Sequence, residues 1–304
     1  MRIQFVLTPT ESKKLISKAV VTIDSFKHAL DKGTIVIHPS STTVFILSEL
    51  GYQLEPSELW ICGLTIQRGL CASAEILQEV RKAGKFDPKE YSHSWIIKKG
   101  KLTRGLQLKD VLPLLAKGDL YIKSPNSIDP NGKVGVLFSA KGAGTIGMVK
   151  KAQRKQGFEI ILPTGLEKLV PKPIEEICRK SPKHGMNFCT GTPCGVIPVE
   201  GSVITELEAI RILSGAESIP IASGGVGGAE GALVLVVRGD EQQIKKVSEV
   251  LGGVKEASLP ILNLLECSEC KRTTCHLSPV FDFSHLPKDG WMVPEAYEMK
   301  VRKH

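Results

Sequence analysis

The sequence has no apolar run that approaches the roughly eighteen residues needed to span a bilayer. Its N-terminus also lacks the longer apolar stretch of a secretory signal peptide. These two absences predict a cytoplasmic protein with no membrane partner. Hydrophobic residues make up 42% of the 304 residues and the mean hydropathy is +0.01, which is typical of globular chains. A chain of this length can bury a substantial core in one large or two ordinary domains.

Aromatic residues are scarce for a basic chain: three Trp and four Tyr accompany a formal net charge of +8. Lys and Arg are spread along the chain in small clusters, and no nucleic-acid-binding motif accompanies them. The charge therefore predicts a solvated surface and a small anionic ligand, and no nucleic-acid partner.

The eight cysteines argue against a disulfide scaffold, because a cytoplasmic compartment keeps thiols reduced. Cys267, Cys270 and Cys275 form a compact cluster of soft ligands that could hold zinc or supply three thiolates to an iron–sulfur cluster. Only one such knuckle is visible, however, and the adjacent His276 would need a contorted geometry to share the ion. Free thiols or an opportunistic disulfide are the alternatives.

A first candidate for ligand binding is the strand-turn-helix pattern at residues 33–50. Residues 34–37 are β-branched and are flanked by Gly33 and Pro39, which predicts a strand. Ser40, Ser41 and Thr42 then precede a helix as hydroxyl-bearing caps. Free N–H groups at a helix N-terminus suit a phosphate or carboxylate, although an ordinary capped turn gives the same pattern.

A second strand is predicted at residues 119–123, followed by Asn126 and Asp129 in a turn rich in Pro and Gly. Asn126 and Asp129 could fix the hydroxyl groups of a small molecule, and Asp129 could move a proton. Alternatively, Asp129 is an Asx-turn residue that organises the loop.

Further along, Gly142, Gly144 and Gly147 match G-x-G-x-x-G before a predicted helix. The only acidic residue about twenty residues further on is Glu167, in a loop bounded by prolines, so a dinucleotide fingerprint is weak. A backbone-lined anion turn at Gly142 and Gly144 fits better, and Lys141 could add a point charge. Glu167 is a second candidate for proton transfer.

Together these segments resemble the superfamily of ribose-5-phosphate isomerase, glucosamine-6-phosphate deaminase and the CoA transferases, which includes the lactate-utilisation branch. The resemblance covers roughly residues 1–180 and consists of motifs only. It implies a ligand site at the carboxyl edge of the sheet and isomerase or transferase chemistry. The isomerases' Asp-Gly-Ala-Asp-Glu is replaced by the segment from Ser124 to Asp129, so only Asp129 could correspond. The transferases' nucleophilic glutamate motif is not visible at an equivalent place.

The alternation of strands and helices predicts an α/β fold, a three-layer doubly wound and mostly parallel sheet over residues 1–182. Residues 183–260 predict a smaller α+β ferredoxin-like domain, with strands at 195–199, 218–222, 232–238 and 254–258 and helices at 205–213 and 240–251. Residues 261–304 form the cysteine-containing C-terminal segment.

Three functions remain open at this point. The chain could be an enzyme, an isomerase or transferase, acting on a small anionic metabolite such as a sugar phosphate or an acyl-CoA-like molecule. It could bind such a metabolite for regulation without turnover, as the translation-initiation regulatory members of the superfamily do. It could also be a metal or redox protein that uses the cysteine cluster. In each case we expect a homo-oligomer.

Overall fold

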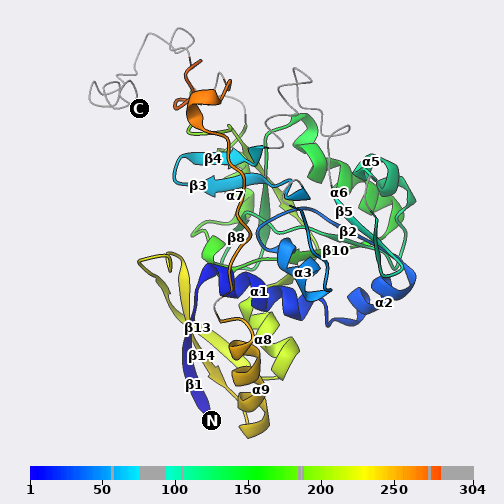
Figure 1. Ribbon diagram of the computed structural model, residues 1–304, viewed down its shortest axis with the longest axis vertical. Coiled ribbons are helices and arrows are strands. Elements are labelled where there is room, and N and C mark those ends of the chain that lie inside the picture. The colour runs from blue at the N-terminus through cyan, green and yellow to red at the C-terminus, as the bar shows by residue number, and fades with distance from the viewer. Residues whose placement is uncertain are drawn as a thin grey trace.

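A computed structural model describes residues 1–55, 58–74, 94–103, 106–183, 186, 188–255, 257–272 and 275–281 (Figure 1). The predicted α/β class is confirmed, and the largest sheet has six strands. Their order across the sheet is β12 (Ser202–Ile204), β10 (Glu159–Pro163), β7 (Leu120–Ile122), β2 (Thr34–Ile37), β5 (Trp95–Lys98) and β6 (Lys101–Thr103). The first four strands run parallel, while β5 is antiparallel to both of its neighbours, so the sheet is mixed.

Both faces of this sheet are apolar, because the side chains of a strand alternate between its two faces. Ile35, Ile37 and Ile122 pack into one cluster with the apolar residues of α1 (Pro9–Val20), α3 (Thr43–Glu49) and α8 (Glu206–Ser214). Val36 and Tyr121 pack into a second cluster with those of α5 (Leu108–Val111) and α6 (Gly144–Gln156). The helix α2 (Asp24–Lys32) adds Phe26 and Ala29 to the first cluster.

A smaller antiparallel sheet has the strand order β1 (Arg2–Leu7), β14 (Ala232–Arg238) and β13 (Glu217–Gly224), next to α9 (Glu241–Gly252) (Figure 1). The predictions of β13, β14, α8 and α9 are confirmed within a few residues at each end. The strand predicted at 254–258 is wrong, since its described residues form a turn and irregular backbone. The third strand is instead β1, which pairs with β14 from Arg2 opposite Arg238 to Leu7 opposite Leu233. The ferredoxin-like arrangement therefore stays a prediction.

The remaining strands form two more sheets. The strand β11 (Gly195–Val199) pairs with β9 (Val134–Phe138), which also pairs with the short β8 (Ser127–Ile128). The strands β3 (Cys62–Ile66) and β4 (Gly69–Ala72) make a hairpin. The helix α7 (Ile174–Lys180) and the 3₁₀ segments η2 (Leu112–Leu114), η3 (Lys141–Ala143), η4 (Leu166–Lys168) and η5 (Cys267–Glu269) complete the described elements. Because β11 and β12 pair with strands of residues 1–182, pairing crosses the predicted domain boundary, and the division itself stays a prediction.

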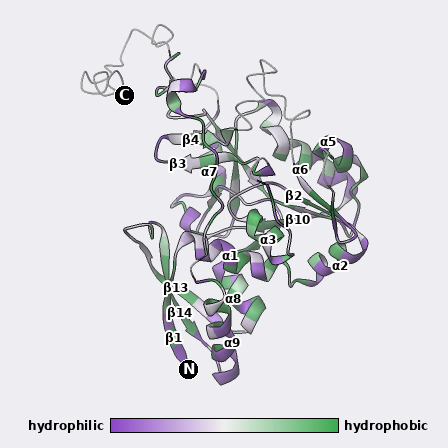
Figure 2. Ribbon diagram, in the orientation of Figure 1, coloured by the Kyte–Doolittle hydropathy of each residue, from purple (hydrophilic) through white to green (hydrophobic). Residues whose placement is uncertain are grey.

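The helices carry hydrophobic and hydrophilic residues on different faces, which Figure 2 shows for α9. Its residues Ile244 and Val247 are buried, and its N-terminus is capped by Asp240, whose side chain accepts a hydrogen bond from the Gln243 N–H. Within the described segments, no helix combines the length and the apolarity that crossing a bilayer requires.

Candidate functional site

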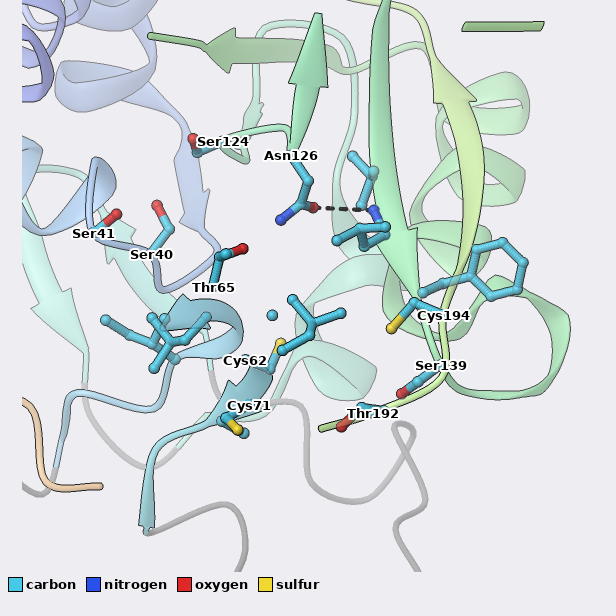
Figure 3. Close-up of a pocket in the computed structure, with 18 of the residues that line it drawn as sticks. Ser40, Ser41, Cys62, Thr65, Cys71, Ser124, Asn126, Ser139, Thr192 and Cys194 are labelled. Carbon is cyan, nitrogen blue, oxygen red and sulfur yellow. Dashed lines mark hydrogen bonds between the residues drawn. The ribbon is translucent and has the colours of Figure 1, made fainter. Parts of the chain in front are cut away.

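The candidate site is a cavity that lies where three parallel strands end. Because β2, β7 and β10 run parallel side by side, the loops after their carboxyl ends meet at one edge of the sheet, where open α/β sheets place ligands. These loops, residues 38–41, 123–126 and 167–170, line a cleft of about 1890 Å³. The β3–β4 hairpin, residues 136–140 and residues 143–146 form further parts of its wall. Figure 3 shows side chains from several of these segments around the cleft.

The described lining of this cleft is strongly basic. Its acidic residues are Glu167 and Glu230. Its basic residues, three times as many, are Lys13, Lys123, Lys168, Lys183, Lys271 and Arg272. An excess of cations in a concave site raises the local concentration of anions. The cleft therefore suits a negatively charged ligand.

Lys123 is the least compensated of these cations. It directly follows β7, and the residue is only 9% exposed. Within the described part of the chain, its ammonium group makes no hydrogen bond and no ion pair, and Lys123 lines the cleft. Burial lowers the pKa of Lys123, because the charged form loses hydration without gaining a partner. Such a group is costly for the fold and is suited to pairing with an anion.

Lys168 lies in η4, just after β10, and is better connected. Its ammonium nitrogen donates a 2.7 Å hydrogen bond to the Ser124 hydroxyl oxygen, which lies 3.3 Å from the Thr42 hydroxyl oxygen. Burial, more than any neighbouring charge, lowers the pKa of Lys168 to about 8. A polar chain thus links the loops after all three strands, and one of its members changes charge not far above neutral pH.

Two carboxylates, those of Glu167 and Glu206, act electrostatically on Lys168. An Oε1 atom of Glu167 is 3.8 Å from the Lys13 ammonium nitrogen, and both carboxylate oxygens of Glu167 are buried without a hydrogen-bond partner among the described residues. Glu206, at the start of α8, accepts a 3.0 Å hydrogen bond from the Leu166 N–H. Burial and then the charge of Glu167 raise the pKa of Glu206 to about 7. The pKa values of Glu206 and Lys168 therefore both lie close to neutral pH.

The cleft brings together five of the residues that the sequence suggested for ligand binding or catalysis, namely Ser40, Ser41, Asn126, Gly144 and Glu167, and Cys270 of the suggested metal site also lines it. The Ser40 hydroxyl accepts hydrogen bonds from the Thr42 and Thr43 N–H groups, so it caps α3 as well as lining the cleft. The Asn126 Oδ1 accepts a 3.0 Å hydrogen bond from the Leu137 N–H, which leaves its amide nitrogen facing the cleft (Figure 3).

The other suggested residues lie elsewhere. Thr42 is fully buried behind the cleft wall and reaches it through Ser124. Lys141 and Gly142 are exposed in η3 and do not line the cleft.

Asp129 is buried outside the cleft lining and is engaged by backbone. Its Oδ1 accepts hydrogen bonds from the N–H groups of Asn131, at 2.8 Å, and Lys133, at 3.0 Å. Its Oδ2 accepts a 3.0 Å bond from the Ile174 N–H, which fixes the start of α7. The side chain is 2% exposed. This geometry favours the Asx-turn interpretation of Asp129 over a role in proton transfer.

A pair that the sequence reasoning missed is His38 and Cys62. His38 follows β2 and is 7% exposed, and its Nε2 lies 3.8 Å from the Cys62 sulfur at the start of β3. Cys62 is exposed. Burial and then the positive charge of Lys123 lower the pKa of His38 well below its usual value. The sequence position of His38 and Lys123 could have indicated that they lie at the site, because each comes directly after a buried strand.

The C-terminal cysteines lie at a second, much smaller cavity of about 30 Å³. Its lining includes four thiols, which are Cys71, Cys267, Cys270 and Cys275. The Gly191 N–H donates a 3.1 Å hydrogen bond to the Cys275 sulfur. Among the residues with described positions, no three His, Cys, Asp or Glu side chains are arranged to hold a metal ion. The zinc or iron–sulfur site stays a prediction.

Comparison with protein-family models, with curated proteins and with solved structures gave no match to this chain. The geometry of the site therefore carries the functional argument.

Proposed function

We propose that the cleft binds a small anionic metabolite, such as a sugar phosphate or an acyl-CoA-like molecule. The observation that carries this proposal is Lys123, which follows β7 and lines the cleft, is only 9% exposed as a residue, and has no hydrogen-bond or ion-pair partner for its ammonium group in the described part of the chain. A buried charge without a partner is expensive, and a bound phosphate or carboxylate supplies the missing partner. The same anion would lie within a cleft whose lining has an excess of cations.

Neutral donors extend the site beyond a single charge. Ser41, Ser124 and Asn126 line the cleft with polar side chains (Figure 3). Hydroxyl and amide groups of this kind recognise sugar hydroxyls and phosphate oxygens. With about 1890 Å³, the cleft accommodates a ligand larger than an isolated phosphate.

An enzymatic function is favoured by the protons that this site can move. Glu206, with a pKa of about 7, and Lys168, with a pKa of about 8, each interact electrostatically with Glu167, which lines the cleft. General acids and bases work best when their pKa values lie near the working pH. Isomerase or transferase chemistry at the carboxyl edge of a three-layer, doubly wound sheet is therefore our first hypothesis. Binding of the same metabolite for regulation, without turnover, is the second.

Isothermal titration calorimetry tests the binding. Inorganic phosphate, ribose 5-phosphate and acetyl-CoA are titrated into the wild-type chain, Lys123→Met and Lys109→Met, the last being an exposed lysine on α5 away from the cleft lining. At least one anion should bind the wild type and Lys109→Met equally. Lys123→Met should bind it about tenfold or more weakly, because a charged hydrogen bond contributes roughly 1.5–3 kcal/mol. Equal binding by Lys123→Met, or no binding of any of the three to the wild type, would refute the proposal.

A further inference from the structure

Cys62 has the surroundings of a reactive thiol. Its sulfur is exposed on the cleft wall (Figure 3), 3.8 Å from the Nε2 atom of the buried His38. Lys123 is close enough to act electrostatically on both His38 and Cys62. The three residues come from separate segments, namely the ends of β2 and β7 and the start of β3. Only the tertiary fold brings a thiol, an imidazole and an ammonium group together.

We propose that Cys62 is a nucleophile, activated by His38, that accepts an acyl group from an activated carboxyl compound bound in the cleft. The acyl donor is a thioester or an acyl phosphate, since each carries the anionic group for which the cleft is suited. The acyl chemistry rests on the proposed function of the cleft, whereas the reactivity of the thiol does not.

The arrangement gives each of the three groups a defined part. Because burial and Lys123 keep His38 neutral, one ring nitrogen of His38 is free to accept a proton. When Nδ1 carries the ring hydrogen, Nε2 is the acceptor and faces the Cys62 sulfur. The thiolate formed by this transfer offsets the positive charges of the imidazolium and of Lys123, both of which lack another anionic partner in the described part of the chain.

The chemical step is balanced within these groups. The Cys62 S–H bond breaks and its proton moves to His38 Nε2, while the sulfur bonds to the carbonyl carbon of the donor. The bond from that carbon to the leaving sulfur or phosphate oxygen then breaks, and the leaving group departs with the proton that His38 returns. The product is an acyl thioester on Cys62, from which water or a second substrate takes the acyl group.

Two of the three other cysteines that line the cleft serve as internal controls. Cys71 and Cys194 also line it, but no described histidine hydrogen-bonds with either of them. Burial raises the pKa of both thiols, that of Cys194 to about 11. They report how a cleft thiol behaves without an imidazole beside it.

The test is alkylation of the full chain with limiting iodoacetamide at pH 7, with the modified peptides quantified by mass spectrometry. Cys62 is more exposed than Cys194, and this difference alone would make its alkylation faster. The alkylation rate of each cysteine in the native protein is therefore compared with the rate of the same cysteine in denaturant, where it is fully exposed. Cys62 should react roughly tenfold faster in the native protein than in denaturant, since an activated thiol is alkylated faster than a free one. The replacement His38→Gln should remove this excess and leave the rate at Cys194 unchanged. A native rate no higher than the denatured rate, or one that His38→Gln preserves, would overturn the proposal.

A second measurement stands if His38→Gln does not fold. Wild-type protein and Cys194→Ser, incubated with acetyl phosphate or acetyl-CoA, should carry an acetyl group on Cys62, and Cys62→Ser should carry none on any cleft thiol. Equal acetylation of Cys62 and Cys194 would refute the proposed acyl-transfer step. Because alkylation needs no anion in the cleft, a loss of thiol selectivity with intact phosphate binding refutes this inference alone. Selective alkylation without anion binding refutes the proposed function, and the acyl chemistry with it, but leaves the activation of Cys62 by His38 in place.

Discussion

Replacing Lys123 by Met should make the ligand-free protein more stable. Met keeps the length of the side chain and fills the same space, but it removes the ammonium group of a residue that is only 9% exposed, a group that has no partner in the described part of the chain. An uncompensated buried polar group costs about 1–3 kcal/mol in proteins. Lys123→Met should therefore raise the free energy of unfolding by this amount. For a large domain this corresponds to about 2–4 °C in Tm per kcal/mol.

The pH dependence of this gain has a definite sign. Burial lowers the pKa of Lys123 below its ordinary value of 10.5, so the folded state holds this proton less tightly than the unfolded state. The penalty is therefore fully present below the folded-state pKa and disappears as the pH rises towards 10.5. The difference in Tm between Lys123→Met and the wild type should be largest near neutral pH and should shrink in alkaline buffer.

Thermal denaturation in phosphate-free buffer, followed by circular dichroism from pH 6 to pH 10, measures both effects. Saturating anion should then reverse the order of stability, because a ligand stabilises only the protein that binds it. Lys109→Met serves as the control and should melt like the wild type in both buffers. A Lys123→Met protein that is less stable than the wild type without anion would show that the ammonium group has a structural partner, and the reasoning would fail.

Three further changes should have separable outcomes. Asp129→Asn should lower the free energy of unfolding, measured by denaturant titration, by about 1.5–3 kcal/mol, because the charged acceptor of three backbone N–H groups is lost. Its affinity for the anion should not change. Weakened anion binding at unchanged stability would contradict this prediction. Anion affinity of the wild type, measured by calorimetry, should fall as the pH rises through about 8, where Lys168 loses its charge, and a flat profile to pH 9 would exclude Lys168 from the site. Burial raises the pKa of Glu206 from 4.5 to about 7, so the stability of the wild type should fall as the pH rises from 4.5 to about 7. The variant Glu206→Gln can still accept the hydrogen bond from the Leu166 N–H, and it should melt at a higher temperature than the wild type at pH 8 and lack this decline. A variant whose stability changes with pH as the wild type's does would argue against the assignment.

Local chemistry in the sequence determined most of the helices and several strands. Asp240 caps α9 because its side chain and the Gln243 N–H are three residues apart, which is a relation within one turn. The β-branched residues before Pro39 gave β2, and Ser40 gave the cap of the helix that follows. Such signals are readable because both partners of each interaction are near one another along the chain.

The strand β1 shows where local reading fails. Its residues alternate, with Ile3, Phe5 and Leu7 packed against the core and Arg2 and Gln4 exposed, which is the period of a strand. Its hydrogen-bond partner β14 lies more than 220 residues away, so nothing nearby in the sequence completes the pattern. The strand expected at 254–258 failed for the converse reason, because the place beside β14 is already taken by β1 and β13.

The candidate site divides in the same way. Parallel strands deliver their following loops to one edge, so the sequence could place Ser40, Asn126 and Glu167 at a common cleft from strand order alone. It could not tell which lysine would be buried there: Lys141 directly precedes a glycine-rich pattern yet is exposed, whereas Lys123 directly follows an ordinary strand and is only 9% exposed. Burial, pairing and the approach of His38 to Cys62 depend on side chains from distant segments, and only the tertiary structure fixes which of them meet.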